Sequence, residues 1–122
     1  MGMIAIWDNR YSVGHARVDA EHRQVISLLN EIDVARSVGA PPVVVEMALE
    51  TLLRTIVAHF ARDEVPQGDH MAIIASARRL LDGWRGGKPE ALERRALVNL
   101  ARRWIGHMGR REASLPSQRM VG

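Results

Sequence analysis

Residues 18–32, VDAEHRQVISLLNEI, decide the fold of this chain. The apolar residues of this segment recur every three or four positions: Val25, Ile26, Leu29 and Ile32. This spacing is typical of one face of an α-helix and differs from the strict alternation of a half-buried strand. His22 precedes Val25 by three residues, so we expect it to lie on the same face and to point into the core. We predict a helix over 19–36 with Asp19 as its N-cap.

The rest of the chain repeats this pattern between breaks that are rich in glycine and proline. Three further helices are predicted, over 41–64, 69–84 and 89–113. An N-terminal arm precedes them at 1–18, and a flexible polar tail follows at 114–122. Short links between helices are typical of antiparallel neighbours. The sequence therefore predicts one all-α domain over 1–122, an up-down-up-down antiparallel four-helix bundle at 19–113 with an N-terminal arm.

Composition excludes several classes of protein. The chain has 122 residues, of which 47% are apolar and 25% charged, so it is too small for a multidomain enzyme and too apolar for a disordered protein. No segment reaches the ~20 uninterrupted apolar residues of a membrane-spanning helix. The first residues lack a signal peptide's basic start, so a cytoplasmic location is expected. There is no cysteine, and any metal must therefore be bound by nitrogen and oxygen.

Charge is distributed unevenly along the chain. Residues 1–70 carry six arginines and ten acidic residues, whereas residues 71–122 carry eleven basic and four acidic residues. The basic half predicts either solvated helix faces or a surface for an anionic partner. Nucleic acid is disfavoured because only Trp84 and Trp104 offer rings for stacking there. No second apolar face is evident, so a monomer is expected.

Each predicted helix carries one histidine on its apolar face: His22, His59, His70 and His107. Two of them stand near the starts of the first and third helices, and two near the ends of the second and fourth. In an antiparallel bundle these four positions share one end. A single histidine on an apolar face is usually an ordinary core residue, but four at one level are expected to converge.

Converging imidazoles indicate a metal site, because neutral imidazole binds divalent iron, zinc, copper or nickel. Asp63 lies one turn beyond His59, and Glu112 lies at the same level in the last helix. Imidazoles and bridging carboxylates together could hold two divalent ions. The alternative is that both carboxylates are solvated helix ends, with Arg110 or Arg111 turning Glu112 outward.

Several motifs bear on the family of the chain: Trp7, Tyr11-Ser12-Val13-Gly14, Val18-Asp19-Ala20-Glu21-His22, His59-Phe60 with Asp63, and Trp104-Ile105-Gly106-His107-Met108 with Glu112. With them the chain resembles, over nearly its whole length, the hemerythrin family, including bacterial hemerythrins and hemerythrin-like cation-binding domains. These four-helix proteins bind oxygen reversibly at a non-haem di-iron centre. The resemblance implies two iron ions as cofactor and six ligands: His22, His59, Asp63, His70, His107 and Glu112.

The ligand set departs from the family pattern. The family usually has Glu where Asp63 stands and Asp where Glu112 stands. It also has two histidines four residues apart in the third helix, whereas this chain has His70 followed by Ile74. The second iron would then lack one imidazole. Two irons are expected, and one iron is the alternative.

Two further interpretations stay open at the sequence level. A different register of the third helix would place Arg78 and Asp82 at the positions of the histidine pair and leave a mononuclear site. His15, seven residues before His22, would either replace the lost ligand or lie partly exposed in the arm.

Three functions are compatible with these residues. The favoured one is reversible binding of dioxygen or a related small molecule such as nitric oxide or peroxide, for storage, delivery or sensing. The second is a di-iron enzyme that reduces peroxide or nitric oxide or oxidises ferrous iron, because an iron short of one ligand has an open position. The third is a mononuclear or metal-free bundle that binds a partner through its basic surface. Binding is favoured over catalysis.

Overall fold

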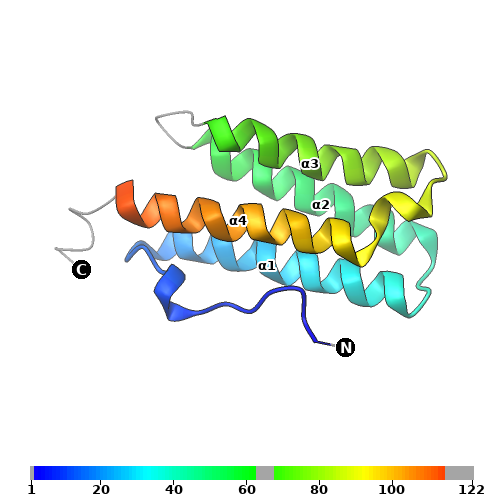
Figure 1. Cartoon of the computed structure of the whole chain (residues 1–122), viewed down its shortest axis with the longest axis horizontal. Helices are drawn as coiled ribbons and strands as arrows, with labels where there is room; N and C mark the ends of the chain where they lie inside the picture. The colour runs from blue at the N-terminus through cyan, green and yellow to red at the C-terminus, as the bar shows by residue number, and fades with distance from the viewer. Residues whose placement is uncertain (1, 63–67, 115–122) are drawn as a thin grey trace.

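The computed structural model describes residues 2–62 and 68–114, with side chains up to residue 109, and all regular structure in this part is helical. Its elements are the 3-10 helix η1 (Asn9–Tyr11), α1 (Ala16–Ser37), α2 (Pro42–Ala61), α3 (Gly68–Arg85), the 3-10 helix η2 (Pro89–Leu92) and α4 (Arg94–Ser114). The prediction of an all-α chain with four main helices is confirmed. Figure 1 shows these four helices lying side by side along the long axis of the molecule. Helix α1 contacts α2 and α4, and α3 contacts the same two helices.

The prediction that Asp19 caps α1 is wrong. The N-cap is His15, whose Nδ1 accepts a hydrogen bond from the Val18 amide at 3.4 Å, and the helix begins directly after it. The Asp19 carboxylate instead accepts hydrogen bonds from the Ser12 hydroxyl at 2.5 Å and the Val13 amide at 2.9 Å. Asp19 therefore ties the arm to the first turn of α1, and a residue upstream takes the capping position.

The helix predicted over 89–113 consists of two pieces. Pro89–Leu92 forms η2, and the extended Glu93 separates it from α4. Helix η2 packs closely on α3, since a Cβ added to Gly83 would lie 2.4 Å from the Cβ of Ala91. The glycine is what permits this approach. The predicted proline in the first turn of the second helix is confirmed, because α2 begins at Pro42.

The beginning of the arm is held on α1 by the side chain of Asn30. The Asn30 carboxamide oxygen accepts from the Ile4 amide at 2.7 Å, and its nitrogen donates to the Ala5 carbonyl at 2.8 Å. Arg94 at the start of α4 donates to the carbonyl of Gly2 and pairs at 2.5 Å with the buried Asp33. Figure 1 shows the arm, in dark blue, running along the helices. These side chains therefore satisfy backbone donors and acceptors of the arm that no helix pairs.

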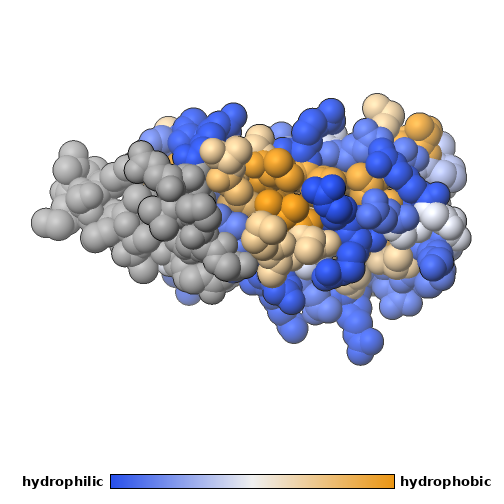
Figure 2. Space-filling view, turned by 90° about the horizontal axis from the view of Figure 1, so that it is seen from above, coloured by the Kyte–Doolittle hydropathy of each residue, from blue (hydrophilic) through white to orange (hydrophobic). Residues whose placement is uncertain are grey.

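All four helices contribute to one hydrophobic core, to which the inward faces predicted from the sequence belong. Trp104 of α4 is fully buried within it. On the face seen in Figure 2, hydrophobic residues gather near the middle, and hydrophilic side chains predominate to the right of them. Within residues 2–62 and 68–114, no helix combines the length and the apolar character needed to cross a membrane.

Candidate metal centre

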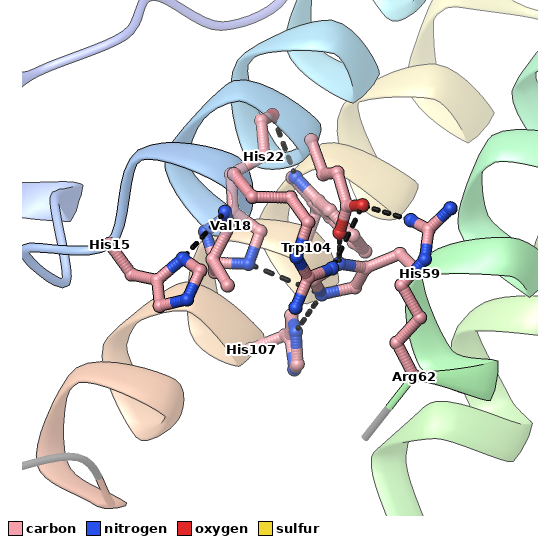
Figure 3. A network of polar contacts seen from close by, with 9 residues as sticks. His15, Val18, His22, His59, Arg62, Trp104 and His107 are labelled. Carbon is pink, nitrogen blue, oxygen red and sulfur yellow. Dashed lines mark hydrogen bonds and ion pairs between the residues drawn. The ribbon is translucent and has the colours of Figure 1, made fainter.

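Three histidines from three helices meet inside the molecule. His22 of α1, His59 of α2 and His107 of α4 are 0–2% exposed. The Nε2 atom of His59 lies 3.3 Å from that of His22 and 3.2 Å from that of His107. One nitrogen from each of the three residues lies within 4.8 Å of the others. Figure 3 shows the three rings directed toward one another, with His59 between the other two.

Trp104 closes one side of this histidine cluster. Its indole N–H donates to the carbonyl of His22 at 3.2 Å, which ties α4 to α1 beside the site. Its ring lies 5.1–5.6 Å, centroid to centroid, from the rings of all three histidines. Aromatic walls of this kind exclude water from a metal site. Trp104 stands three residues before His107, so one turn of α4 supplies both the wall and one histidine of the cluster.

The outer nitrogen of His59 faces Glu21. The Nδ1 atom lies 2.6 Å from Oε1 of Glu21, whose carboxylate also contacts Arg62 and, at 3.1 Å, Arg17. Burial raises the pKa of Glu21, but the hydrogen bond to His59 and the positive charges of Arg62 and Arg17 outweigh burial and leave that pKa lowered. Glu21 is therefore ionised near neutral pH.

Glu21 was not predicted to be a functional residue from the sequence. It appeared there only as part of the motif before His22. Its position beside His22 was the available indication. Consecutive residues of a helix point about 100° apart, so a residue next to a core histidine can face a neighbouring helix. That the neighbour would present His59 became clear only in three dimensions.

His107 is held in its neutral form. Burial, followed by repulsion from His22, His59 and His70, lowers its pKa from 6.5 to about 3, while the Asp69 carboxylate acts in the opposite direction. Oδ2 of Asp69 lies 3.7 Å from Nδ1 of His107. A neutral imidazole has a lone pair available for a metal, so this environment favours ligation over protonation.

His70 is buried, as predicted, but lies beside the three-histidine set. Its ring stacks on Phe60, with centroids 4.0 Å apart and planes within 13°, and lies 5.3 Å from the ring of His107. Ile74, one turn further on, packs partly buried against the core. His70 thus flanks the cluster, which among the described residues consists of His22, His59 and His107.

The other predicted ligands are placed as follows. Asp63 lies outside the described residues, and Glu112 lies in α4 beyond the last described side chain. His15 is the N-cap of α1 and is not a member of the three-histidine group found among the described residues.

The two nitrogen–nitrogen distances at His59 fit a divalent cation. A tetrahedral ion about 2.0–2.1 Å from each imidazole nitrogen separates those nitrogens by about 3.3–3.4 Å. The two distances at His59, 3.3 and 3.2 Å, match this value. Uncharged nitrogen donors suit iron, zinc, copper and nickel better than magnesium or calcium. The residues present therefore fit a transition-metal ion.

Comparison with known proteins yielded no match among family models, curated proteins or solved structures.

Proposed function

We propose that this protein is a hemerythrin-like, non-haem iron-binding protein that binds dioxygen or a similarly small diatomic ligand reversibly. The observation that carries the proposal is the buried cluster of His22, His59 and His107, with its nitrogens at the spacing of metal ligands. The motifs that resemble the hemerythrin family add the choice of iron. The proposed role is storage, delivery or sensing of the ligand.

The proposal includes the finer topology of the fold, an up-down-up-down antiparallel bundle. In Figure 1 the chain reverses direction between consecutive helices. Helices adjacent in sequence also contact one another, from α1·α2 through α2·α3 to α3·α4. Such a bundle accounts for the site, because the start of α1 and the ends of α2 and α4 then lie at one level.

The burial of the site determines which ligands can reach it. His22, His59 and His107 would hold the ion, and their 0–2% exposure shields it from solvent, which favours a small ligand over a bulky one. Trp104 and Phe60 line the site with aromatic surface and keep water away. When bound, reduced iron supplies electron density for reversible binding of a diatomic molecule. The chain's own contribution is to position three neutral imidazoles and to exclude solvent.

The proposed oxygen-binding centre would hold two irons, whereas a second candidate function would use one metal ion or none. A di-iron centre would also use Asp63, His70 and Glu112. The stacking of His70 on Phe60 favours a single-metal site instead, since this contact holds the ring beside the cluster. In that second candidate the protein is a partner-binding module. Exposed Arg79 and Arg103 on the adjacent helices α3 and α4 would then attract an anionic partner.

Metal analysis of protein purified without chelators tests the proposal. Two irons per chain support the di-iron centre, and one iron supports the single-metal candidate. Less than one metal per chain overturns both of these and supports a metal-free bundle. Spectra recorded with and without oxygen then show whether binding is reversible. His59→Ala is expected to lose the metal, whereas Val57→Ala, a truncation on the same helix, is expected to keep it. Equal metal content in the two variants would refute the site.

A further inference from the structure

We propose that Glu21 is a positioning residue of the metal centre. It holds His59 in the tautomer that carries its proton on Nδ1, so that the Nε2 lone pair is directed at the cation. This inference rests on the proposed metal-binding function and deepens it, because it identifies a residue outside the ligand set that makes one ligand competent.

The argument begins with the two nitrogens of one ring. A neutral imidazole has one N–H and one lone pair, and an ionised carboxylate only accepts hydrogen bonds. Nδ1 of His59 lies 2.6 Å from Oε1 of Glu21, so that nitrogen is the one that carries the proton. The lone pair is then on Nε2, which lies 3.3 and 3.2 Å from the matching atoms of His22 and His107. The contact with Glu21 therefore selects the ligating form of the central histidine.

Glu21 is itself held in place from two sides. Arg17, one turn earlier on α1, donates to Oε2 at 3.1 Å, and Arg62 at the end of α2 contacts the same oxygen. The Glu21 side chain is 13% exposed, while that of Arg62 is 51% exposed and reaches solvent. Two guanidinium groups on one oxygen leave the other oxygen for His59. Charged partners make such hydrogen bonds shorter and stronger than neutral ones.

The adjacent residues Glu21 and His22 act on two different imidazoles of the cluster. His22 contributes a nitrogen to the cluster directly, while Glu21, the residue before it, orients the ligand that comes from α2. Two consecutive residues of α1 thus supply one imidazole of the cluster and orient a second. Carboxylate partners of this type raise the basicity of a ligating histidine and limit its rotation.

Two measurements test the proposal. Nitrogen-15 NMR of the metal-free wild-type protein near neutral pH reports which nitrogen of His59 carries the proton, and Nδ1 is expected. Titration with Co²⁺, followed by its visible absorption, reports metal affinity. Removal of an outer partner typically weakens affinity 10–100-fold, and this loss is expected for Glu21→Ala. Glu21→Gln, whose amide oxygen can still accept from Nδ1, is expected to recover part of the affinity. Glu31→Gln, the same charge change at an exposed position of α1, serves as the control and is expected to bind like wild type.

The outcomes separate this inference from the proposed function. If wild-type protein takes up no Co²⁺, the metal site itself fails. If wild type binds Co²⁺ and Glu21→Ala binds it equally well, the site stands and the role of Glu21 is refuted. A proton on Nε2 of His59 in the wild-type protein also refutes that role, and this result does not depend on the folding of any variant.

Discussion

Acid should destabilise the metal-free protein through His107. Its folded-state pKa is lowered to about 3, below the ordinary value of 6.5, because of burial and repulsion from its histidine neighbours. Between these two values the unfolded chain binds a proton at this ring and the folded chain does not. The associated stability is therefore fully present above pH 6.5 and is lost as the pH falls toward 3.

The size of the effect follows from the difference between the two pKa values. Each unit corresponds to about 1.4 kcal/mol, so the full loss attributable to His107 is about 5 kcal/mol. Between about pH 7.5 and about pH 5, the expected decrease in the free energy of unfolding is about 2 kcal/mol. This is a large fraction of the ~5–15 kcal/mol stability of a typical domain.

Urea unfolding in the presence of a chelator, followed by circular dichroism over this pH range, measures the effect. His107→Gln removes the titrating ring and should lose about 2 kcal/mol less than wild type over the same interval. Ile56→Val, a truncation elsewhere in the core, should lower stability by about 0.5–1.5 kcal/mol at every pH and leave the slope unchanged. Parallel wild-type and His107→Gln profiles would refute the reasoning, because they would show that His107 binds a proton equally in both states.

Three further experiments test the packing of the arm, of η2 and of Trp104. Asn30→Ala should lower the free energy of unfolding by about 1–3 kcal/mol, because backbone groups of Ile4 and Ala5 lose their partner. Protease cleavage within the arm should also accelerate. An unchanged cleavage rate would contradict the role of Asn30 in holding the arm. Gly83→Ala should destabilise the protein by about 1–3 kcal/mol, because the added methyl group clashes with η2. Gly109→Ala, whose added methyl group meets nothing within 4 Å, should stabilise it by up to about 1 kcal/mol. Thermal melts that shift in the same direction for both variants would contradict this account. Trp104→Phe should cost about 1–3 kcal/mol in urea unfolding, because the indole hydrogen bond to the His22 carbonyl is lost and the smaller ring leaves a void in the core. A cost near zero would contradict this account.

Several features of the fold were predictable from the sequence because they depend on local spacing. The three-and-four period of apolar residues predicts the helices and their inward faces. His22, His59, His70 and His107 are all buried, as their positions on those faces require. The N-cap of α1 was not predictable in this way. Asp19 has the residue type of a cap, but its carboxylate is engaged by the arm. Capping preferences amount to about 1 kcal/mol, and tertiary hydrogen bonds of similar strength can override them.

The sequence by itself determined which residues face the interior, because helical periodicity assigns every side chain to a face without reference to any partner. Only the tertiary structure decided which imidazoles meet. His70 shares the burial of the other three histidines, yet stacks on Phe60 beside the cluster. A metal requires its ligand atoms within a few ångströms of one another, whereas periodicity leaves the axial offset and rotation of each helix undetermined. Those quantities depend on how whole faces interlock, and the same packing brought Glu21 to His59.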